Sequence, residues 1–455
     1  MATADPVTLV VRPGRPLGGA FTPPGDKSIT HRAFLLGLLA EGETSVEAAN
    51  PGADGAATLS CAAALGARVQ SRDGVIRIAG RGGALVEPDR VLDCGNSGTT
   101  LRLLAGVLAS QPFLAVLSGD ASLNARPVAR VIEPLRRMGA SLHARDGDRL
   151  PPLVVRGAAL TGVEFDAPTA SAQVASSILL AGLGARGVTS VGTTAGVRDH
   201  TPRMLERFGL PIRAQGGDGG VTRWTVEGPV VPRAARVRIP GDFSAAAFFL
   251  AAAAATPGAR VTARGVSLNP TRTGLLATLE AMGARVETRA IAASPADGTG
   301  GEPVGEITVT GPDRLEATTI APDRVAAMID EIPAWAIAAS AARGVSRLTG
   351  AGELRIKESD RIAALAVNLE RLGIAVEELP DGLAITGGRV AGGTVDAALD
   401  HRIAMAFAVL ATRASGPVVI HGAGGIATSY PGFADALAAL GGDVTSGDAA
   451  VAARG

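Results

Sequence analysis

Apolar and polar positions follow two patterns along this chain, and the pair of patterns recurs six times. Each recurrence begins with a helical run that closes on an apolar residue and a glycine, and then continues into a strand. The glycines at these helix ends are Gly66, Gly139, Gly209, Gly283, Gly373 and Gly441, at intervals of 68–90 residues. Glycine suits this position because it adopts the left-handed conformation that ends many helices. The repetition predicts six units that combine helix and strand.

A second strand follows several of these helix ends and also closes on a glycine. The segments are GVIRIAG, PPLVVRG, RWTVEG, GEITVTG and GLAITG. The longest interval, which ends at Gly373, is partly explained by the polar segment IAASPADGTGGEP before the second strand of the fourth unit. That segment is expected to be a loop.

A break separates the first three units from the last three. Residues 229–242 carry three prolines and a cluster of arginines, which is typical of a linker. We therefore expect two similar domains facing each other across a cleft, where ligands commonly bind. A solenoid of six structural repeats is the alternative. Its usual repeat is shorter, about 20–50 residues, and it leaves the polar motifs below unexplained.

The most apolar run, from Phe243 to Thr256, is mostly alanine and ends at a proline. It is too short to span a bilayer and predicts a buried helix. We see no basic segment followed by an apolar core at the start of the chain, and hence no signal peptide. The two cysteines, Cys61 and Cys94, form neither a disulfide framework nor a zinc pattern. We expect a reduced, cytoplasmic setting without membrane attachment and without a metal.

Charge and aromatic content exclude a class of partner. The chain carries 43 basic and 43 acidic residues, and aromatic residues make up 3%. A nucleic-acid-binding protein needs a basic surface and, for single strands, aromatic stacking platforms. No nucleic-acid partner is therefore expected, and any anion site must be built locally by a few cations in a cleft.

Lysine is scarce. Only two of the 43 basic residues, Lys27 and Lys357, are lysine. Arginine effectively cannot release a proton, whereas a lysine ammonium can, and it is more compact. We hypothesise that both lysines do what arginine cannot: Lys27 as a phosphate-side cation that also donates a proton, and Lys357 as a compact cation facing Asp330.

Polar motifs of the first half stand at the starts of apolar helical runs. The segment GDKSITHR brings Lys27, Ser28 and Arg32 to one such start. An ammonium, a hydroxyl and a guanidinium at a helix N-terminus form an anion site. A capped surface helix is the alternative. The segment is no P-loop, because Asp26 interrupts the required Gly-Lys-Ser/Thr order.

Further first-half motifs follow the same plan. GNSGTT places Gly98 at a helix entry where backbone amides meet a ligand, although a plain tight turn is equally consistent. Arg126 precedes a proline and could act as a bidentate anion clamp; alone, such an arginine is usually just solvated. The remaining candidates of this half are Ser171, Gln173, Arg198, Asp199 and His200.

The second half repeats the arrangement. Asp330 and Glu331 precede a helix opened by Pro333. In LRIKESDR, Lys357 and Arg361 lie one helical turn apart with Glu358 between them. A third helix opens with Asp400 as its expected cap, followed by His401 and Arg402.

Both halves therefore present cations at helix starts. The seven candidates are Lys27, Arg32, Arg126, Arg198, Lys357, Arg361 and Arg402. Seven cations are too many for one phosphate and suit two anionic substrates, of which one or both are phosphorylated. Asp330 and Glu358 are carboxylates among these cations and are candidates for a base and a proton-transfer group.

Taken in order, these motifs closely resemble the 5-enolpyruvylshikimate-3-phosphate synthase (3-phosphoshikimate 1-carboxyvinyltransferase) family. The resemblance runs from about Pro24 to about Leu440 and rests on GDKSITHR, GNSGTTLR, NARPVARVIEPLRRMGA, SAQVASSILLAGL, IDEIP, LRIKESDR and DHRIAMAF. It implies two inside-out α/β domains, each with three repeated βαβαββ units. It also implies that the start of the chain joins the second domain, so that the domains comprise residues 21–240, and 1–20 with 241–455.

The same resemblance implies a reaction and a set of roles. The family transfers the carboxyvinyl group of phosphoenolpyruvate to the 5-hydroxyl of shikimate 3-phosphate, without a cofactor or metal. Shikimate 3-phosphate would be bound by Lys27, Ser28, Arg32, Ser171, Ala172, Gln173, Arg198, Asp330 and Lys357. Phosphoenolpyruvate would be bound by Lys27, Gly98, Arg126, Gln173, Arg361 and Arg402. Asp330 would take the hydroxyl proton, while Glu358 and Lys27 would serve the vinyl carbon and the leaving phosphate.

The chain departs from many family members at three places. It has Ser171-Ala172-Gln173 in place of Ser-Ser-Gln, an Arg-Asp-His-Thr stretch at Arg198, and Thr428 in place of a lysine. These point to the branch associated with tolerance of the inhibitor glyphosate, yet Gly98 is retained. The resemblance further implies a cytoplasmic monomer.

Two other functions compete with this interpretation. UDP-N-acetylglucosamine enolpyruvyl transferase shares the fold and the donor, but it uses a cysteine in a loop where this chain has SGDASLNARP. An anion-binding protein without catalysis would explain the cations but not Asp330 and Glu358 among them.

Overall fold

The computed structural model describes residues 7–167, 171–217, 220–291, 298 and 301–448 of the 455-residue chain. The chain divides into two compact units. Unit 1 comprises Met1–Pro24, Gly241–Ala292 and Pro303–Gly455; unit 2 comprises Gly25–Pro240 and Ala293–Glu302. Compared with the domains expected from the sequence, residues 21–24 fall in unit 1 and residues 293–302 fall in unit 2. The expected linker, residues 229–242, contains the boundary at Pro240.

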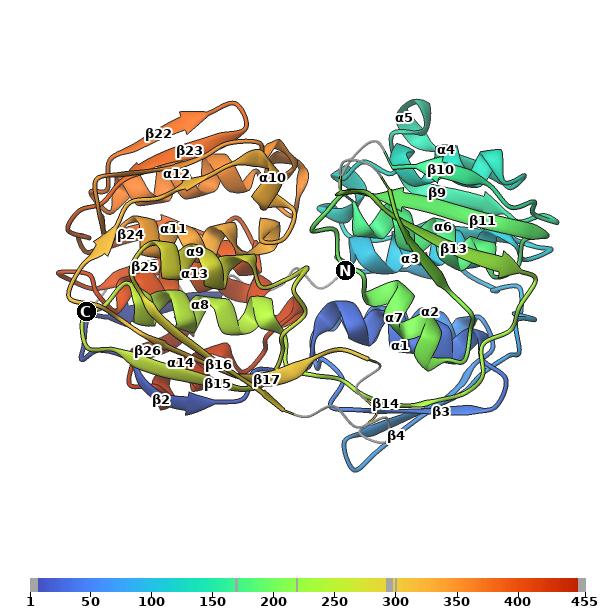
Figure 1. Ribbon diagram of the computed structural model, residues 1–455, viewed down its shortest axis with the longest axis horizontal. Coiled ribbons are helices and arrows are strands. Elements are labelled where there is room, and N and C mark those ends of the chain that lie inside the picture. The colour runs from blue at the N-terminus through green and yellow to red at the C-terminus, as the bar shows by residue number, and fades with distance from the viewer. Residues whose placement is uncertain (1–6, 168–170, 218–219, 292–297, 299–300, 449–455) are drawn as a thin grey trace. The chain divides into compact units, whose positions relative to one another are not determined.

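Each unit contains three copies of one sheet (Figure 1). Every copy has four strands, of which the first two are parallel and the remaining neighbours are antiparallel. In unit 2 the strand orders are β14 (Arg236–Arg238), β3 (Glu43–Glu47), β5 (Val75–Ala79), β4 (Arg68–Arg72); β6 (Leu92–Asp93), β7 (Leu114–Ser118), β9 (Leu150–Arg156), β8 (Ser141–Ala144); and β10 (Glu164–Asp166), β11 (Gly187–Thr193), β13 (Thr222–Gly228), β12 (Arg213–Gly216).

In unit 1 the same pattern returns. The orders are β2 (Gly18–Phe21), β15 (Arg260–Ser267), β17 (Val304–Thr310), β16 (Arg285–Ile291); β19 (Thr319–Ile320), β21 (Val345–Leu348), β23 (Gly382–Thr386), β22 (Val376–Leu379); and β24 (Gly393–Asp396), β25 (Val418–His421), β1 (Val7–Arg12), β26 (Asp443–Asp448). A small parallel pair joins β18 (Leu315–Glu316) to β20 (Ala342–Arg343). The six repeats expected from the helix-ending glycines are confirmed.

Strand exchange closes the repeats. β1 pairs with β25 and β26 and fills the place that β23 takes in the neighbouring sheet. β2 precedes the first helix along the chain but pairs with β15 of unit 1, whereas β14 returns to pair with β3 of unit 2. The chain therefore enters and leaves unit 2 through strands that each complete a sheet begun elsewhere in the sequence.

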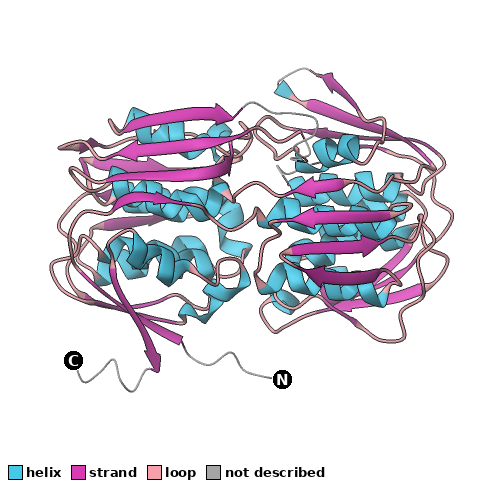
Figure 2. Cartoon of the chain, turned by 90° about the horizontal axis from the view of Figure 1, so that it is seen from below, coloured by secondary structure: helices cyan, strands magenta, loops and turns pink. Residues whose placement is uncertain are grey.

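Helices fill the inside of each unit, and the sheets lie outside them (Figures 1 and 2). The innermost helices are α1 (Lys27–Leu39), α3 (Gly98–Ala109) and α6 (Ala172–Gly182) in unit 2, and α8 (Phe243–Ala254), α11 (Ile332–Ala339) and α13 (His401–Ala411) in unit 1. Every residue of α8, α11 and α13 is buried. The apolar run that begins at Phe243 is thus a buried helix, as predicted, and no helix among the described residues is long and apolar enough to cross a membrane.

The other helices complete the repeats. They are α2 (Ala53–Ala64), α4 (Ala129–Arg137), α5 (Arg145–Asp148) and α7 (His200–Arg207) in unit 2, and α9 (Gly274–Ala281), α10 (Pro322–Val325), α12 (Arg361–Arg371) and α14 (Phe433–Ala439) in unit 1. Short 3-10 turns span Leu123–Ala125, Ile329–Glu331, Gly352–Ile356 and Ala423–Thr428. The six helix-ending glycines have φ between 75° and 113°. The left-handed helix ends expected from the sequence are therefore confirmed.

Helices α3 and α6 approach each other closely at a glycine. A Cβ atom at Gly106 of α3 would lie 2.1 Å from the backbone oxygen of Ser177 in α6 and 2.8 Å from its carbonyl carbon. Real Cβ atoms do not approach a backbone so closely, so this crossing requires glycine. The starts of α3 and α6 carry candidate site residues, and Gly106 thus fixes the packing on which their spacing depends.

Gly106→Ala is expected to destabilise unit 2. Alanine gains about 1 kcal/mol in helix propensity, but moving the α6 backbone to admit the methyl group costs roughly 1–3 kcal/mol or more. A lower thermal midpoint, followed by circular dichroism, measures the net loss. Gly216→Ala is the matched control, because a Cβ there meets nothing within 4 Å. Equal midpoints for wild type and Gly106→Ala would contradict the close crossing.

Candidate active site

The start of α1 in unit 2 positions Lys27. Asp26 is the N-cap, and its carboxylate accepts a hydrogen bond from the Ile29 amide at 2.9 Å. Asp26, the residue that interrupts the P-loop order, is thus the cap of this helix. Lys27 is the first helical residue, and its ammonium donates to Asp54 Oδ2 at 2.8 Å. The side chains of Lys27 and Asp54 are 13% and 8% exposed, so Asp54 fixes the ammonium near the surface.

Arg32 lies one turn further along α1 and is buried. Its Nε donates to Thr201 Oγ1 at 2.6 Å, and Nη2 donates to Ser176 Oγ at 2.8 Å. Nη1 donates to the backbone oxygen of Ser28 at 2.8 Å. Ser176 and Thr201 are themselves 2.6 Å apart. Sequence analysis missed both hydroxyls; the polar pair in the apolar run VASSILL was the signal for Ser176.

The glycine turn before α3 is organised by its own side chains. Ser97 caps α3 by accepting from the Thr100 amide at 3.1 Å. Asn96 accepts from Arg126 Nη2 at 2.6 Å, and Ser122 accepts from the same nitrogen at 3.0 Å. Arg126 is therefore fixed against the turn that carries Gly98, rather than solvated.

Arg102 was missed by sequence analysis. It is buried within α3, where its Nη1 donates to Gln173 Oε1 at 2.7 Å and its Nη2 donates to the backbone oxygen of Pro127 at 2.9 Å. Gln173 in turn donates to Thr99 Oγ1 at 3.0 Å. A Cβ at Gly98 would lie 2.6 Å from Arg102 Nη1. Arg102 thus links Gly98, Gln173 and the Arg126 loop, and its position inside an apolar helix hid it from motif searches.

The remaining first-half candidates stand at two helix starts. Ser171 is the buried N-cap residue of α6, and Ala172 is the first residue of that helix. Arg198 is half-buried and precedes Asp199, the N-cap residue of α7. Both starts belong to unit 2, as do those that carry Lys27 and Gly98.

His31 is buried beside the cations of α1. Its Nδ1 lies 2.6 Å from Thr58 Oγ1, which lies 2.6 Å from Thr100 Oγ1. Burial, with the neighbouring charges of Lys27 and Arg32, places the pKa of His31 well below its ordinary value. His31 is therefore neutral at physiological pH and adds no charge to this group.

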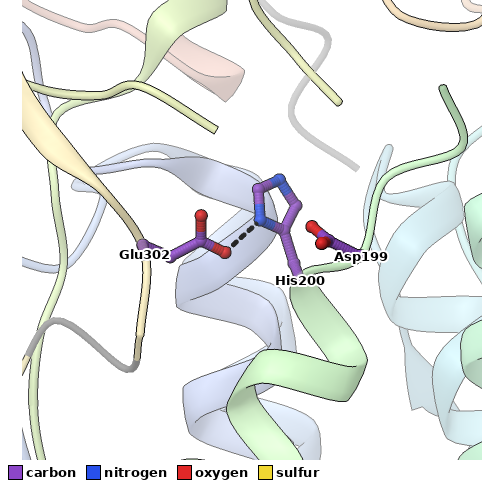
Figure 3. Close-up of side chains that lie close together, drawn as sticks. All are labelled: Asp199, His200 and Glu302. Carbon is purple, nitrogen blue, oxygen red and sulfur yellow. Dashed lines mark hydrogen bonds and ion pairs between the residues drawn. The ribbon is translucent and has the colours of Figure 1, made fainter. Parts of the chain in front are cut away.

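One cluster of metal-ligating composition is present among the described residues. Asp199, His200 and Glu302 offer ligand atoms that all lie within 4.8 Å of one another (Figure 3). His200 Nδ1 lies 2.6 Å from Glu302 Oε1, and Asp199 pairs with the guanidinium of Arg203 at 2.9 Å. A hydrogen-bonded histidine and a neighbouring arginine fit a charge network better than a metal site, because the arginine repels a cation. The sequence expectation of no metal stays a prediction.

Arg361 is the centre of the candidate site in unit 1. It is fully buried at the start of α12, 2.8 Å from Asp400, 2.5 Å from Glu358 and 3.4 Å from Asp330. Burial alone lowers the pKa of Arg361, but the charges of Asp400 and Glu358 outweigh it and raise the pKa above its ordinary value. Three carboxylates thus hold one permanent cation in place.

Asp330 also contacts Arg402 at the start of α13. Arg402 Nη1 donates to the backbone oxygen of Asp330 at 2.8 Å, and Nη2 lies 3.6 Å from its carboxylate. Asp400 caps α13, as expected, by accepting from the Arg402 amide at 2.9 Å. Pro333 stands in the first turn of α11, as expected.

Lys357 behaves differently from the hypothesis. Its ammonium lies 3.5 Å from Glu353, within the same turn, and no ion pair with Asp330 is found among the described residues. Arg361 and Arg402 provide the charged contacts of Asp330 instead. Lys357 directly follows the 3-10 turn Gly352–Ile356, whereas α12 begins at Arg361, so the two residues do not lie one turn apart on a single helix as the sequence predicted.

A second buried network in unit 1 was also missed. Arg272 donates to Ser244 Oγ at 2.7 Å and to Asp242 Oδ1 at 3.1 Å. Ser244 also hydrogen-bonds to Glu331, the neighbour of Asp330. This network fixes the chain on the other side of Asp330 at the start of α11.

Within each unit, the helix starts therefore present fixed cations, hydroxyls and amides together. Such groups stabilise anions, because their charge and dipoles are oriented before a ligand arrives. In unit 1 a carboxylate, Asp330, lies between two of the guanidiniums and can accept a proton from a bound hydroxyl. The arrangement suits group transfer between anionic substrates.

Known proteins with similar sequences carry out group transfer of this kind. The model of a family described as EPSP synthase (3-phosphoshikimate 1-carboxyvinyltransferase) matches residues 11–437. A protein named 3-phosphoshikimate 1-carboxyvinyltransferase from Anaeromyxobacter sp. (strain K) is 48% identical over 452 residues, which cover 98% of this chain and 99% of the relative. One of that name from Acidithiobacillus ferrooxidans (strain ATCC 53993 / BNL-5-31) is 48% identical over 426 residues, 93% of this chain and 95% of the relative.

A solved structure agrees in fold. The EPSP synthase of Acinetobacter baumannii superposes with a TM-score of 0.83 at 40% sequence identity and covers 97% of this chain and 100% of its own.

The buried His31 predicts how stability depends on pH. Unfolded His31 takes up a proton below pH about 6.5, whereas the folded form resists it, so acid favours unfolding and this stability is lost as pH falls. The slope approaches about 1.4 kcal/mol per pH unit. Urea unfolding at pH 7 and pH 5 should therefore show a larger loss for wild type than for His31→Asn, by up to about 2 kcal/mol. Identical losses would show that His31 protonates freely in the folded chain.

Proposed function

Since this chain belongs to the EPSP synthase family, we propose which of its residues carry out the reaction of that family. The protein is a transferase that moves the carboxyvinyl group of phosphoenolpyruvate to the 5-hydroxyl of shikimate 3-phosphate and releases phosphate. The step belongs to the shikimate pathway of aromatic amino acid biosynthesis. The alternative acceptor, UDP-N-acetylglucosamine, is not favoured, because the family and the named relatives act on 3-phosphoshikimate.

Shikimate 3-phosphate is assigned to the helix starts around Arg32. The supporting observation is that Arg32 is oriented by three oxygens, from Ser28, Ser176 and Thr201, and is therefore rigid before a phosphate arrives. The assigned contacts are Lys27, Ser28, Arg32, Ser171, Ala172, Gln173, Arg198, Asp330 and Lys357.

Phosphoenolpyruvate is assigned to a second set of groups. Arg126, fixed by Asn96 and Ser122, offers a planar guanidinium next to the turn of Gly98. Arg361 and Arg402 offer two more guanidiniums on either side of Asp330. The full set is Lys27, Gly98, Arg126, Gln173, Arg361 and Arg402, with Gln173 touching both substrates.

The chemistry needs three proton transfers. Asp330 removes the proton of the 5-hydroxyl as its oxygen attacks C2 of phosphoenolpyruvate, while C3 gains a proton from Glu358 or Lys27. In the tetrahedral intermediate, C3 then returns a proton to Glu358 or Lys27, the C2–O bond to phosphate breaks, and the double bond reforms as phosphate leaves. The Asp54 carboxylate, 2.8 Å from the Lys27 ammonium, keeps that donor in place.

Three further properties belong to the proposal. The protein acts as a cytoplasmic monomer; the support is that both cysteines, Cys61 and Cys94, are free and buried, as a reduced compartment permits. Glyphosate, an anion with phosphonate and carboxylate groups, competes for the phosphoenolpyruvate contacts. The chain retains glycine at position 98. A Cβ there would lie 2.6 Å from Arg102 Nη1 and would press on this guanidinium.

A phosphate-release assay tests the function. Wild-type protein given phosphoenolpyruvate and shikimate 3-phosphate should release one phosphate per enolpyruvyl product detected by mass spectrometry. Replacing the acceptor with UDP-N-acetylglucosamine is expected to give no product. Binding of shikimate 3-phosphate in calorimetry, without phosphate release, would support the non-catalytic anion-binding alternative instead.

Asp330→Asn tests the assigned base. The amide preserves shape and keeps one oxygen for Arg361, while the bond from Arg402 goes to the backbone oxygen and is unaffected. The amide cannot take the hydroxyl proton. We expect kcat to fall by about 10²–10⁴-fold, the usual contribution of a general base, with shikimate 3-phosphate affinity within about threefold. Asp323→Asn, an exposed substitution on α10, is the control. An unchanged kcat for Asp330→Asn would remove Asp330 from the chemistry.

A further inference from the structure

The contact between His200 and Glu302 has no part in the roles assigned above. Both side chains are fully buried, and His200 Nδ1 lies 2.6 Å from Glu302 Oε1 (Figure 3). The two residues are 102 positions apart in sequence. A buried polar pair costs desolvation energy, so its retention calls for a structural or functional reason.

Glu302 lies near the end of the polar segment IAASPADGTGGEP, which the sequence predicts to be a loop. The strands on either side of that segment, β16 and β17, pair with each other in unit 1, whereas Glu302 belongs to unit 2. Within unit 2 its neighbours in the segment are also bonded: Gly301 O accepts from Arg203 Nη1 at 2.9 Å, and Gly298 O accepts from the Arg238 amide at 2.8 Å. The segment is thus attached to unit 2 at three residues.

Two of these attachments converge on the first turn of α7. His200 is the first residue of that helix, and Arg203 is one turn along it. Arg203 also pairs with Asp199 at 2.9 Å, so Asp199 and Glu302 approach the turn from two chain segments. The first turn of α7 is therefore fixed from outside the helix, by a segment that no local sequence signal connects to it.

This turn borders one residue assigned to shikimate 3-phosphate, Arg198, and supports a second, Arg32. Arg198 lies two residues before His200, and Thr201 lies directly after it. Thr201 Oγ1 accepts from Arg32 Nε at 2.6 Å. A shift of His200 would therefore move Arg198 and would loosen Arg32 at once.

We propose that Glu302 is a positioning residue. It acts through His200 to hold the first turn of α7, so that Arg198, and Arg32 through its bond to Thr201, stay in place for the phosphate of shikimate 3-phosphate. The inference rests on the proposed function. Glu302 touches no reacting atom. Its effect falls on the binding of one substrate, because the groups assigned to phosphoenolpyruvate do not belong to α7.

Two substitutions of Glu302 test whether its hydrogen-bond acceptor is what positions His200. Glu302→Ala removes the carboxylate that lies 2.6 Å from His200 Nδ1, and the KM for shikimate 3-phosphate should rise about tenfold. The KM for phosphoenolpyruvate and kcat should stay within about twofold of wild type. Glu302→Gln keeps an acceptor oxygen for His200 and should restore the KM for shikimate 3-phosphate to within about twofold.

Glu306→Ala is the matched control. Glu306 lies on the same hairpin, in β17, and pairs with the exposed Arg289 at 2.8 Å. Its substitution removes a carboxylate of the same hairpin without touching α7, and both KM values should remain those of wild type. Thermal midpoints of all three variants show whether each is folded.

The outcomes are distinct. Equal rises of both KM values in Glu302→Ala, an unchanged KM for shikimate 3-phosphate, or failure of Glu302→Gln to restore it would overturn the positioning role. If Glu302→Ala does not fold, Glu302→Asp takes its place: its shorter side chain withdraws the carboxylate from His200, and the same selective rise in the KM for shikimate 3-phosphate is expected. Stoichiometric Zn²⁺ binding by wild type that is lost in Glu302→Gln would also overturn it in favour of a metal site. Failure of the proposed function is separate, since wild type would then release no phosphate.

Discussion

The structure depends on keeping permanent cations buried at the starts of helices. Arg361 illustrates the constraint: its side chain is 1% exposed, and three carboxylates lie within 3.4 Å of it. Taking a guanidinium out of water is costly, and only close, well-oriented partners offset that cost. The fold must therefore fix the partners before it can fix the cation. Once it has done so, the cation cannot relax, and its field is available to a substrate without reorganisation.

The repeated fold meets this constraint by bringing helix starts together. In unit 2, the start of α1 reaches α6 and α7 through Arg32, and the start of α3 reaches α6 through Arg102 and Gln173. Short polar side chains on one helix serve as ligands for an arginine on the next. Such contacts require a constant helix spacing, which the close crossing at Gly106 maintains. Core packing and site geometry are therefore parts of one arrangement.

The fold could largely be predicted from sequence, and so could the placing of charged residues at helix starts, because their signals are local. A glycine that ends a helix in the left-handed conformation is visible at Gly66 or Gly373 without any tertiary information. An N-cap such as Asp400 is visible from its spacing to the helix it opens. The partners Ser176, Thr201, Arg102 and Arg272 could not be assigned in this way. Their roles depend on which helices become neighbours, and within an apolar helix a serine or an arginine carries no mark of its partner.

Lys357 and Glu302 illustrate two kinds of contact that sequence motifs do not reveal: one with a near neighbour and one with a distant residue. The scarcity of lysine led us to expect Lys357 as a compact cation facing Asp330, yet its ammonium lies 3.5 Å from Glu353 of its own segment. Local geometry prevailed there over a long-range contact. At Glu302 the reverse holds, because a residue after a low-complexity loop forms a buried contact with His200, 102 positions away. A segment rich in glycine, alanine and proline carries little sequence pattern. The role of Glu302 therefore becomes visible only from its contact with the first turn of α7. The irregular insertion is thus where the chain makes a buried contact outside the repeat.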